Sequence, residues 1–346
     1  MPPNDTPAPF QETNLKPIDM HTHIVGNGTG GTGCWLRVGG WHQPLAAIML
    51  RHIGLPAGAL AGELDRPYVE RLLEQLRASS LGAAVILAQD LVYDQQGRPI
   101  DGAGSFYVPN EYVLKLATQN PEFLPAVSIH PARPDALEEL GHCLEAGAVM
   151  MKCLPNCQNI DCNDRRFTRF WERMAEAKLP LLAHTGGEHT IPVVCHRFSD
   201  PRILTLPLEC GVNVIAAHCA TKSGLFDPEY FHAFVEMTRR FPNLYGDSSA
   251  FNVPLRGRHV RECLRLPLLD RMVHGSDYPV PVHGHFAWMR GSVDWKSFRR
   301  CERLTNILER DYQLKVAMGF PAESFTRVWK LLRLAPCPVA RDSPLH

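Results

Sequence analysis

The chain has 346 residues, of which 45% are hydrophobic and 21% charged, and its basic and acidic residues balance at 36 each. This ordinary globular composition excludes wholesale disorder, and zero net charge with no long basic run argues against nucleic acid and anionic membrane surfaces as partners. No apolar run approaches the roughly 18 residues that a membrane-spanning helix needs.

We interpret residues 1–15 as a polar, proline-rich leader, because they lack the basic start and the apolar stretch of a signal peptide. Eleven cysteines without such a signal indicate reduced thiols in a cytoplasmic protein. Three of them, Cys153, Cys157 and Cys162, lie close together but lack C-x-x-C pairs. We therefore favour ordinary thiols there over a cysteine metal site.

From residue 16 onward, apolar runs rich in β-branched residues predict strands. There are eight such runs, at residues 16–23, 82–90, 123–130, 147–154, 179–185, 212–219, 243–250 and 271–279. Amphipathic segments between them predict helices, at residues 65–81, 110–120, 134–146, 167–178, 201–211 and 227–242. Strands and helices therefore alternate, which is typical of parallel strands joined by right-handed crossovers.

Eight strand–helix units in one chain predict an α/β protein of the (β/α)8 TIM-barrel class. No low-complexity linker divides the chain, so we expect a single domain over residues 16–340 with long βα-loop insertions. The insertions are residues 24–62, which begin with a glycine-rich run, and residues 91–110. Such loops carry lids and substrate contacts in barrels, although a surface insertion without function fits the glycine run equally well. A doubly wound sheet with an accessory domain is the structural alternative.

The first predicted strand ends in two histidines one residue apart. Alternate side chains of an extended strand share a face, so Asp19, His21 and His23 are expected to point the same way. Two imidazoles on one face suit a pair of metal ligands. With 16 histidines in the chain, a chance pair is the alternative at this point.

Other predicted strands also end in polar residues, and the carboxyl ends of barrel strands meet at one mouth. These residues are His130, Lys152, His184, His218, Asp247 and Asp277. Such side chains are depleted within strands because burying them unpaired is costly. We therefore expect nitrogen and oxygen donors to converge on one axis, where they suit zinc or a similar divalent ion.

The segments DMHTH, MKCLP, LLAHTGGE, VIAAHC and HGSDYP resemble motifs of the amidohydrolase superfamily of metal-dependent hydrolases. They are nearest its amidohydrolase-2 branch, which also holds decarboxylases and hydratases, and the resemblance runs from about residue 16 to about residue 333. It implies one or two metal ions surrounded by His21, His23, His184, His218 and Asp277. The segment GFPAESFTRVWKLLRL resembles the family's closing helix but lacks an asparagine often seen there, a departure that bears on packing.

In binuclear members of that superfamily, a lysine at the end of the fourth strand is carboxylated and bridges two metal ions. The segment MMKCLP is similar to that context. The resemblance therefore implies that Lys152 becomes a metal ligand after carboxylation, which turns a cation into an anionic oxygen donor. A snorkelling lysine or a buried ion pair is the alternative.

The remaining candidates also have purely structural interpretations. His130 fits a hydrogen-bonded barrel histidine better than a metal ligand, and Asp247 suits either a carboxylate that orients a ligand histidine or a helix N-cap. A second H-x-H pair, His283 and His285, is expected to lie in a loop. The residues expected to contact substrate are His130, Asn156, Glu188 and Tyr93. The loops also carry residues that suit a partly aromatic pocket with one anion contact: Trp35, Arg98, Phe106, Tyr107 and Trp288.

The resemblance implies an enzyme, a metal-dependent hydrolase that cleaves an amide, lactone or ester bond of a small molecule. One or two divalent ions, zinc by expectation, would activate water, with Asp277 as the general base. His218 would complete a second metal site or stabilise the oxyanion. Two alternatives stay open: a mononuclear decarboxylase or hydratase with an unmodified Lys152, and a ligand-binding barrel without activity. The resemblance also leaves a homo-oligomer, either a dimer or a tetramer, open.

Overall fold

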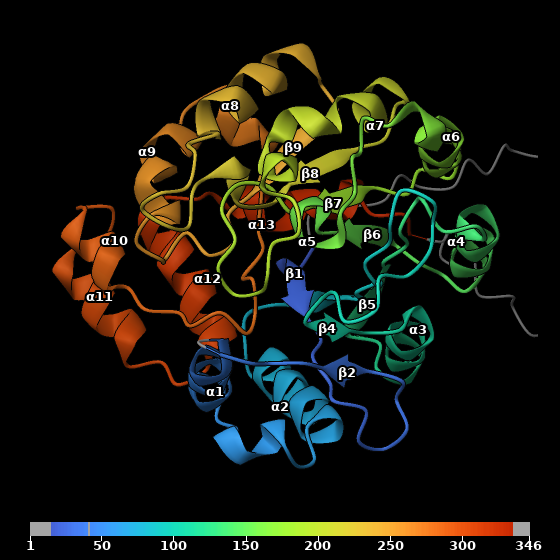
Figure 1. Cartoon of the computed structure of the whole chain (residues 1–346). Helices are drawn as coiled ribbons and strands as arrows, with labels where there is room; N and C mark the ends of the chain where they lie inside the picture. Colours follow the sequence, from blue (N-terminus) through green and yellow to red (C-terminus); the bar gives the residue numbers. More distant parts are fainter. Residues whose placement is uncertain (1–14, 41, 335–346) are drawn as a thin grey trace, which may run out of the picture.

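A computed structural model describes residues 15–40 and 42–334 of the chain. Eight parallel strands form one sheet in the order β1-β3-β5-β6-β7-β8-β9-β10, with helices around it (Figure 1). The strands are β1 (Ile18–His23), β3 (Ala83–Leu87), β5 (Phe123–Val127), β6 (Met150–Cys153), β7 (Leu181–Ala183), β8 (Val214–Ala216), β9 (Leu244–Asp247) and β10 (Met272–Val273). A small antiparallel sheet pairs β2 (Trp35–Leu36) with β4 (Phe106–Tyr107). The expected leader, apart from residue 15, and the expected domain end at residue 340 lie outside the described residues.

The segment after β10 closes the barrel against β1. The Met20 amide donates to the His274 carbonyl at 3.1 Å, and the His23 amide donates to the Tyr278 carbonyl at 2.9 Å. In return, the Asp277 amide donates to the His21 carbonyl at 2.9 Å. The last strand therefore lies beside the first, and the predicted (β/α)8 barrel is confirmed.

Helices occur at all six predicted places: α2 (Asp65–Arg77), α3 (Asn110–Gln119), α4 (Ala136–Glu145), α6 (Thr168–Glu176), α7 (Thr205–Glu209) and α8 (Phe231–Arg240). The segment predicted at 201–211 is shorter than expected, since a 3-10 turn over Pro201–Leu204 precedes α7. None of the helices in the described part of the chain combines the length and the apolar character needed to cross a membrane.

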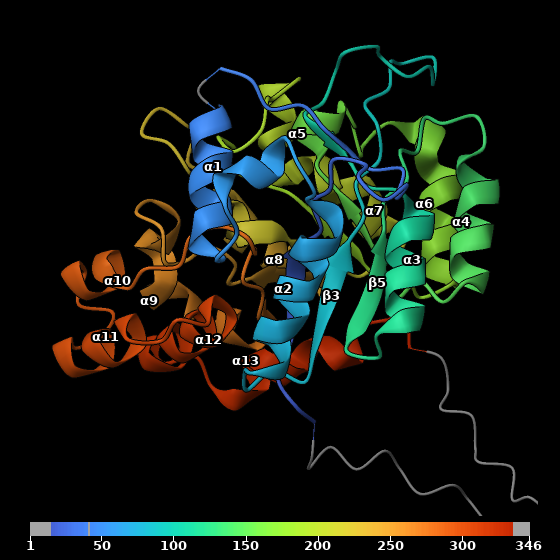
Figure 2. The same cartoon turned by 90° about the horizontal axis from the view of Figure 1, so that it is seen from below.

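The structure also contains helices that the sequence did not predict: α1 (His42–His52), α5 (Pro155–Gln158), α9 (Val260–Cys263), α10 (His285–Met289), α11 (Trp295–Glu302) and α12 (Ile307–Met318). Figure 2 shows α1 at the same end of the barrel as α5, which follows β6, whereas α13 (Ala322–Thr326) lies at the opposite end. The first insertion therefore covers the end where the strands finish. His285, expected in a loop, is the first residue of α10.

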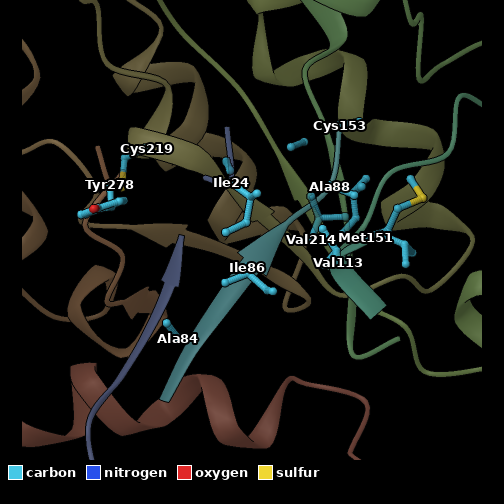
Figure 3. Close-up of a cluster of buried hydrophobic side chains, with 14 of the residues drawn as sticks. Ile24, Ala84, Ile86, Ala88, Val113, Met151, Cys153, Val214, Cys219 and Tyr278 are labelled. Atoms are coloured by element: carbon cyan, nitrogen blue, oxygen red, sulfur yellow. The ribbon is translucent and has the colours of Figure 1, made fainter. Parts of the chain in front are cut away.

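Alternation along the strands divides the apolar residues between two cores. Outward-facing side chains pack beneath the helices, as Ala84 and Ile86 of β3 and Ala88 just after it do (Figure 3). A separate cluster fills the barrel interior; it includes Ile18, Met20, Val85, Met150, Leu182, Ile215 and Val273. Val328 and Leu331, after α13, pack against this cluster. Apolar side chains thus fill the barrel interior at its lower end, and polar side chains gather at the mouth.

A β-bulge in β1 breaks this alternation. Asp19 is paired with Ala84 and Thr22 with Ile86, so β1 uses three steps where β3 uses two. His23 consequently pairs with Leu87, an inward-facing residue, while Asp19 pairs with an outward-facing one. The expectation that Asp19 shares a face with His23 was wrong, because the extra residue reverses the alternation.

A buried ion pair on α12 supports the segment that follows β10. The Lys315 ammonium donates to the Asp311 carboxylate and to the Gly275 carbonyl, both at 2.5 Å. Asp19 lies close enough to feel the same cation, and burial raises the pKa of Asp19. Burial also raises the pKa of Asp311 to about 7, even though Lys315 opposes this. One cation thus offsets two buried carboxylates and holds the chain two residues before Asp277.

We expect Lys315→Met to lower the free energy of unfolding by about 3 kcal/mol, because a broken buried pair leaves an uncompensated charge. Urea unfolding followed by circular dichroism measures this loss. The double variant Lys315→Met/Asp311→Leu removes the stranded carboxylate and should recover part of it. A single variant as stable as the parent, or a double variant no better than the single one, would contradict this account.

Candidate metal centre

His21, His23 and Asp277 present three potential ligand atoms at the mouth of the barrel. The Nε2 atoms of the two histidines are 3.2 Å apart. The Asp277 Oδ1 atom lies 3.3 Å from the first and 3.4 Å from the second. All three atoms lie within 4.8 Å of one another. Two imidazoles and one carboxylate fit a divalent ion such as zinc.

His21 is held in the form that a ligand needs. Its Nδ1 atom lies 2.7 Å from the Asp247 carboxylate, so that this nitrogen donates and Nε2 keeps its lone pair for the centre. Burial, and then the charge of Lys152, lowers the pKa of His21 to about 4. The imidazole is therefore neutral at pH 7, as metal binding requires.

Asp247 orients both sides of the centre. Besides accepting from His21, its carboxylate accepts from the His218 amide at 2.6 Å and from the Ser249 hydroxyl at 2.5 Å. Burial alone would raise the pKa of Asp247, but the hydrogen bond and charge of His21, with His218 and Ser249, bring that pKa below its usual value. These contacts correspond to the orienting carboxylate of the two expectations for this residue, not to a helix N-cap.

Lys152 reaches the centre from β6. Its Nζ atom lies 3.1 Å from His21 Nε2, and its side chain is fully buried. Burial lowers the pKa of Lys152, although Asp277 and Asp247 oppose this effect. A lowered pKa favours the neutral amine, which is the form that reacts with carbon dioxide to give a carbamate. The surroundings of Lys152 thus fit a carboxylated lysine chemically.

His184 and His218 complete the ring of candidates. The His218 ring lies 5.4 Å from that of His21 and 5.2 Å from that of His184, measured between centroids. His218 Nε2 is 3.9 Å from the Asp277 carboxylate. The buried Nε2 atom of His184 has no hydrogen-bond partner among the described residues and lies 3.5 Å from Glu188. Buried polar atoms are normally satisfied, so an unpartnered imidazole nitrogen beside this group fits a metal ligand.

His218 is aimed inward by a left-handed turn. Ile215 of β8 and Ala217 just after it face the interior, so strict alternation would point the next side chain away from it. Instead His218, Cys219 and Ala220 have φ values of 58°, 51° and 56°. Left-handed backbone costs roughly 1–2 kcal/mol per residue. The bonds from the His218 amide to Asp247, and from the Thr221 hydroxyl to the His218 carbonyl at 2.7 Å, hold the turn.

A cavity of about 330 Å³ opens onto the centre. His23, His184, Glu188 and Asp277 line it on the barrel side. The residues from the first insertion that line it are Val25, Leu36, Arg37, Val38, Gly39, His42, Ala46, Met49, Leu50 and Leu60, and Phe106 comes from the second. The side chains that form most of this wall were not expected to contact substrate, because nothing in a glycine-rich insertion shows which way it folds.

Of the four expected substrate contacts, Glu188 lines this cavity and the others lie elsewhere. His130 Nε2 is 2.9 Å from the Gln158 carbonyl, and the Tyr93 ring packs on the His130 ring at 4.9 Å. Asn156 is buried, with its amide nitrogen 3.1 Å from the Ser199 hydroxyl. The contacts of these three residues link neighbouring loops to one another.

Two features near the mouth were not expected. Arg256 is buried and donates to the Gly187 carbonyl at 2.8 Å. Burial lowers the pKa of His184, and the charge of Arg256 adds to this effect. No sequence signal could have found it, since it follows β9 in a segment without periodicity. The second H-x-H pair also forms a group with Glu302 whose potential ligand atoms lie within 4.8 Å of one another, but the histidines are exposed.

The Amidohydrolase family model (Amidohydro_2) matches residues 18–289. None of the curated proteins compared with the chain matches it. Among solved structures, an uncharacterized TIM-barrel protein from Bordetella bronchiseptica is 17% identical, with a TM-score of 0.54 over 88% of this chain and 99% of its own. A putative 2-pyrone-4,6-dicarboxylic acid hydrolase from Pseudomonas putida is 16% identical (TM-score 0.50, 92% and 95%). A 5-carboxyvanillate decarboxylase from Sphingomonas paucimobilis is 14% identical (TM-score 0.52, 90% and 99%).

Identities this low show a common fold and leave the reaction type open, since the similar structures include both a hydrolase and a decarboxylase by name. The family model covers well over half of the chain and begins and ends around the residues of the centre. The chain therefore belongs to the Amidohydrolase (Amidohydro_2) family of enzymes.

Proposed function

We propose that this chain is a metal-dependent hydrolase that cleaves an amide, lactone or ester bond of a small molecule. The observation that carries the proposal is the convergence of His21, His23 and Asp277 within hydrogen-bonding range, with the Lys152 amine 3.1 Å from the first of them. His184 and His218 would serve as further ligands. A divalent ion held there would lower the pKa of a water molecule and polarise a carbonyl.

In this proposal the side chains of the chain supply the proton transfers. Burial would raise the pKa of Asp277, but its interactions with His21, His218 and His23 hold that pKa well below its usual value, so its carboxylate is ionised and able to accept a proton. It would take the proton of the attacking water and return it to the leaving group. His218 lies 3.9 Å away and would stabilise the oxyanion or complete a second metal site.

Zinc as the metal, carboxylation of Lys152 and a cytoplasmic location are further parts of this proposal. Two imidazoles and a carboxylate suit zinc. Every cysteine among the described residues is free, which suits a reducing compartment.

The second candidate is a mononuclear decarboxylase or hydratase of the same family. The observation that favours it is that His21, His23 and Asp277 form a complete group of three ligands without Lys152. Lys152 would then remain an amine. Carbon dioxide release from aromatic or dienoic acids, measured beside acid or ammonia release from esters and amides, separates the two reactions. Carbon dioxide as the product would replace the hydrolase.

We expect protein purified without chelator and with bicarbonate to contain about two divalent ions per chain. Elemental analysis measures this, and Lys152→Met should reduce the content to about one because the bridging ligand is lost. The control is His283→Gln/His285→Gln, which removes the exposed second group and should leave the count unchanged. A count of about one in the parent, with a free Lys152 amine in a crystal structure, would contradict carboxylation.

We expect Asp277→Asn to lower kcat by about 10³-fold, in the range of a lost general base, while the fold survives. Circular dichroism and metal content would be measured beside the rate, so that loss of the ion is distinguished from loss of the base. Glu302→Gln, at the exposed group, is the matched control and should keep parental kcat. Unchanged turnover in Asp277→Asn would remove Asp277 from the mechanism.

A further inference from the structure

The cavity has two chemically different sides. On the barrel side it meets His23 and Asp277, the reacting end of the proposed site. On the other side the first insertion supplies the apolar wall, which includes Val25, Leu36, Met49 and Leu60. Within the first insertion, α1 lies at the end of the barrel where the strands finish (Figure 2). A molecule whose reacting group lies at Asp277 must therefore place the rest of its body against apolar side chains.

Few positively charged side chains line the part of the cavity where the body of this molecule would lie. Arg37 is the one arginine or lysine among the described residues that line the cavity, and its exposed guanidinium lies 4.3 Å from the centre of the Trp35 ring. Arg256 is buried nearby, but it donates to the carbonyls of Gly187 and Thr221. Arg98, the anion contact expected from sequence, pairs with Asp94 at 2.9 Å.

A carboxylate held against Val25, Met49 and Leu60 would thus lie among apolar side chains, with the exposed Arg37 as the one arginine or lysine of the described cavity lining that could pair with it. Burying an ionised carboxylate unpaired is strongly unfavourable, whereas apolar surface gains free energy from the same transfer. Phe106, whose ring lies edge-on to His23 with 6.5 Å between centroids, adds an aromatic surface directly beside the reacting end. The cavity is also small, since about 330 Å³ lies at the lower end of the roughly 300–1,000 Å³ range of ligand sites.

We propose that the substrate is a small molecule with a compact apolar body, aromatic or branched aliphatic, and no carboxylate beyond the reacting group. This inference rests on the proposed function, because it takes the metal centre as the reacting end. It differs from the substrates named for two of the similar structures, a pyrone dicarboxylate and a carboxyvanillate, which carry carboxylates.

The test is binding of a matched pair of ligands to the metal-loaded protein. The pair is 3-phenylpropanohydroxamic acid and its para-carboxy derivative, which share a metal-binding group and differ by one charge at the far end. Isothermal titration calorimetry should show the neutral ligand binding at least about tenfold more tightly. Equal affinity, preference for the carboxylate, or no binding of either ligand would overturn the proposal.

Two variants of Met49 locate the preference in the wall. Met49→Lys should shift the ratio of the two affinities toward the carboxylate by about tenfold or more, because it places a positive charge in the apolar part of the wall. Met49→Leu keeps the wall apolar and should leave the ratio within about twofold. Unchanged selectivity in Met49→Lys, at parental metal content, would show that the far end of the ligand does not reach this wall.

Turnover of neutral aryl esters is measured separately. If the neutral hydroxamate is preferred but no ester, lactone or amide is cleaved, the proposed hydrolase fails and the inference about the substrate body stands. If esters are cleaved but the carboxylated ligand is preferred, the hydrolase stands and this inference fails.

Discussion

The centre depends on a conflict between strand alternation and ligand placement. In a parallel barrel, every second side chain of a strand points into the barrel interior, and the lower interior positions are filled by apolar side chains. β6 and β7 meet the requirement simply, since Lys152 and His184 lie two residues beyond Met150 and Leu182 in the interior cluster. β1 and β8 do not, because their histidines lie an odd number of residues from the apolar residues that face the interior. Strict alternation would therefore point these histidines away from the centre.

Each of these two strands solves the conflict by a local change in the backbone. The bulge in β1 lets Ile18 stay in the apolar interior while His23 also faces inward. The left-handed turn after β8 does the same for His218, and Asp277 has a φ of 67° where the chain leaves β10. Strained backbone conformations of this kind persist only when several contacts with the surrounding structure hold them in place. Asp247 provides this support by binding the His218 amide and the His21 ring together.

The sequence was sufficient for whatever depends on local pattern. Eight apolar runs gave eight strands, six amphipathic segments gave helices, and polar residues at strand ends gave the members of the centre. It was not sufficient for the bulge, which depends on how β1 registers against β3, nor for the inward turn of His218. Arg256 and the wall that includes Met49 were missed for the same reason: their positions follow from how loops fold back on the barrel, and periodicity carries no such information.

This division between barrel and insertion explains why membership of the family leaves the reaction and the substrate open. The proposed ligands lie at or just beyond strand ends, where backbone hydrogen bonds and a packed interior fix their positions. The wall facing them comes from an insertion whose described residues form one strand, β2, which pairs with β4 in the second insertion and not with the eight-stranded sheet. That wall can change in sequence without moving the ligands. The chemistry of the centre and the shape of its substrate are therefore set by separate parts of the chain, and only the first part is shared through the fold.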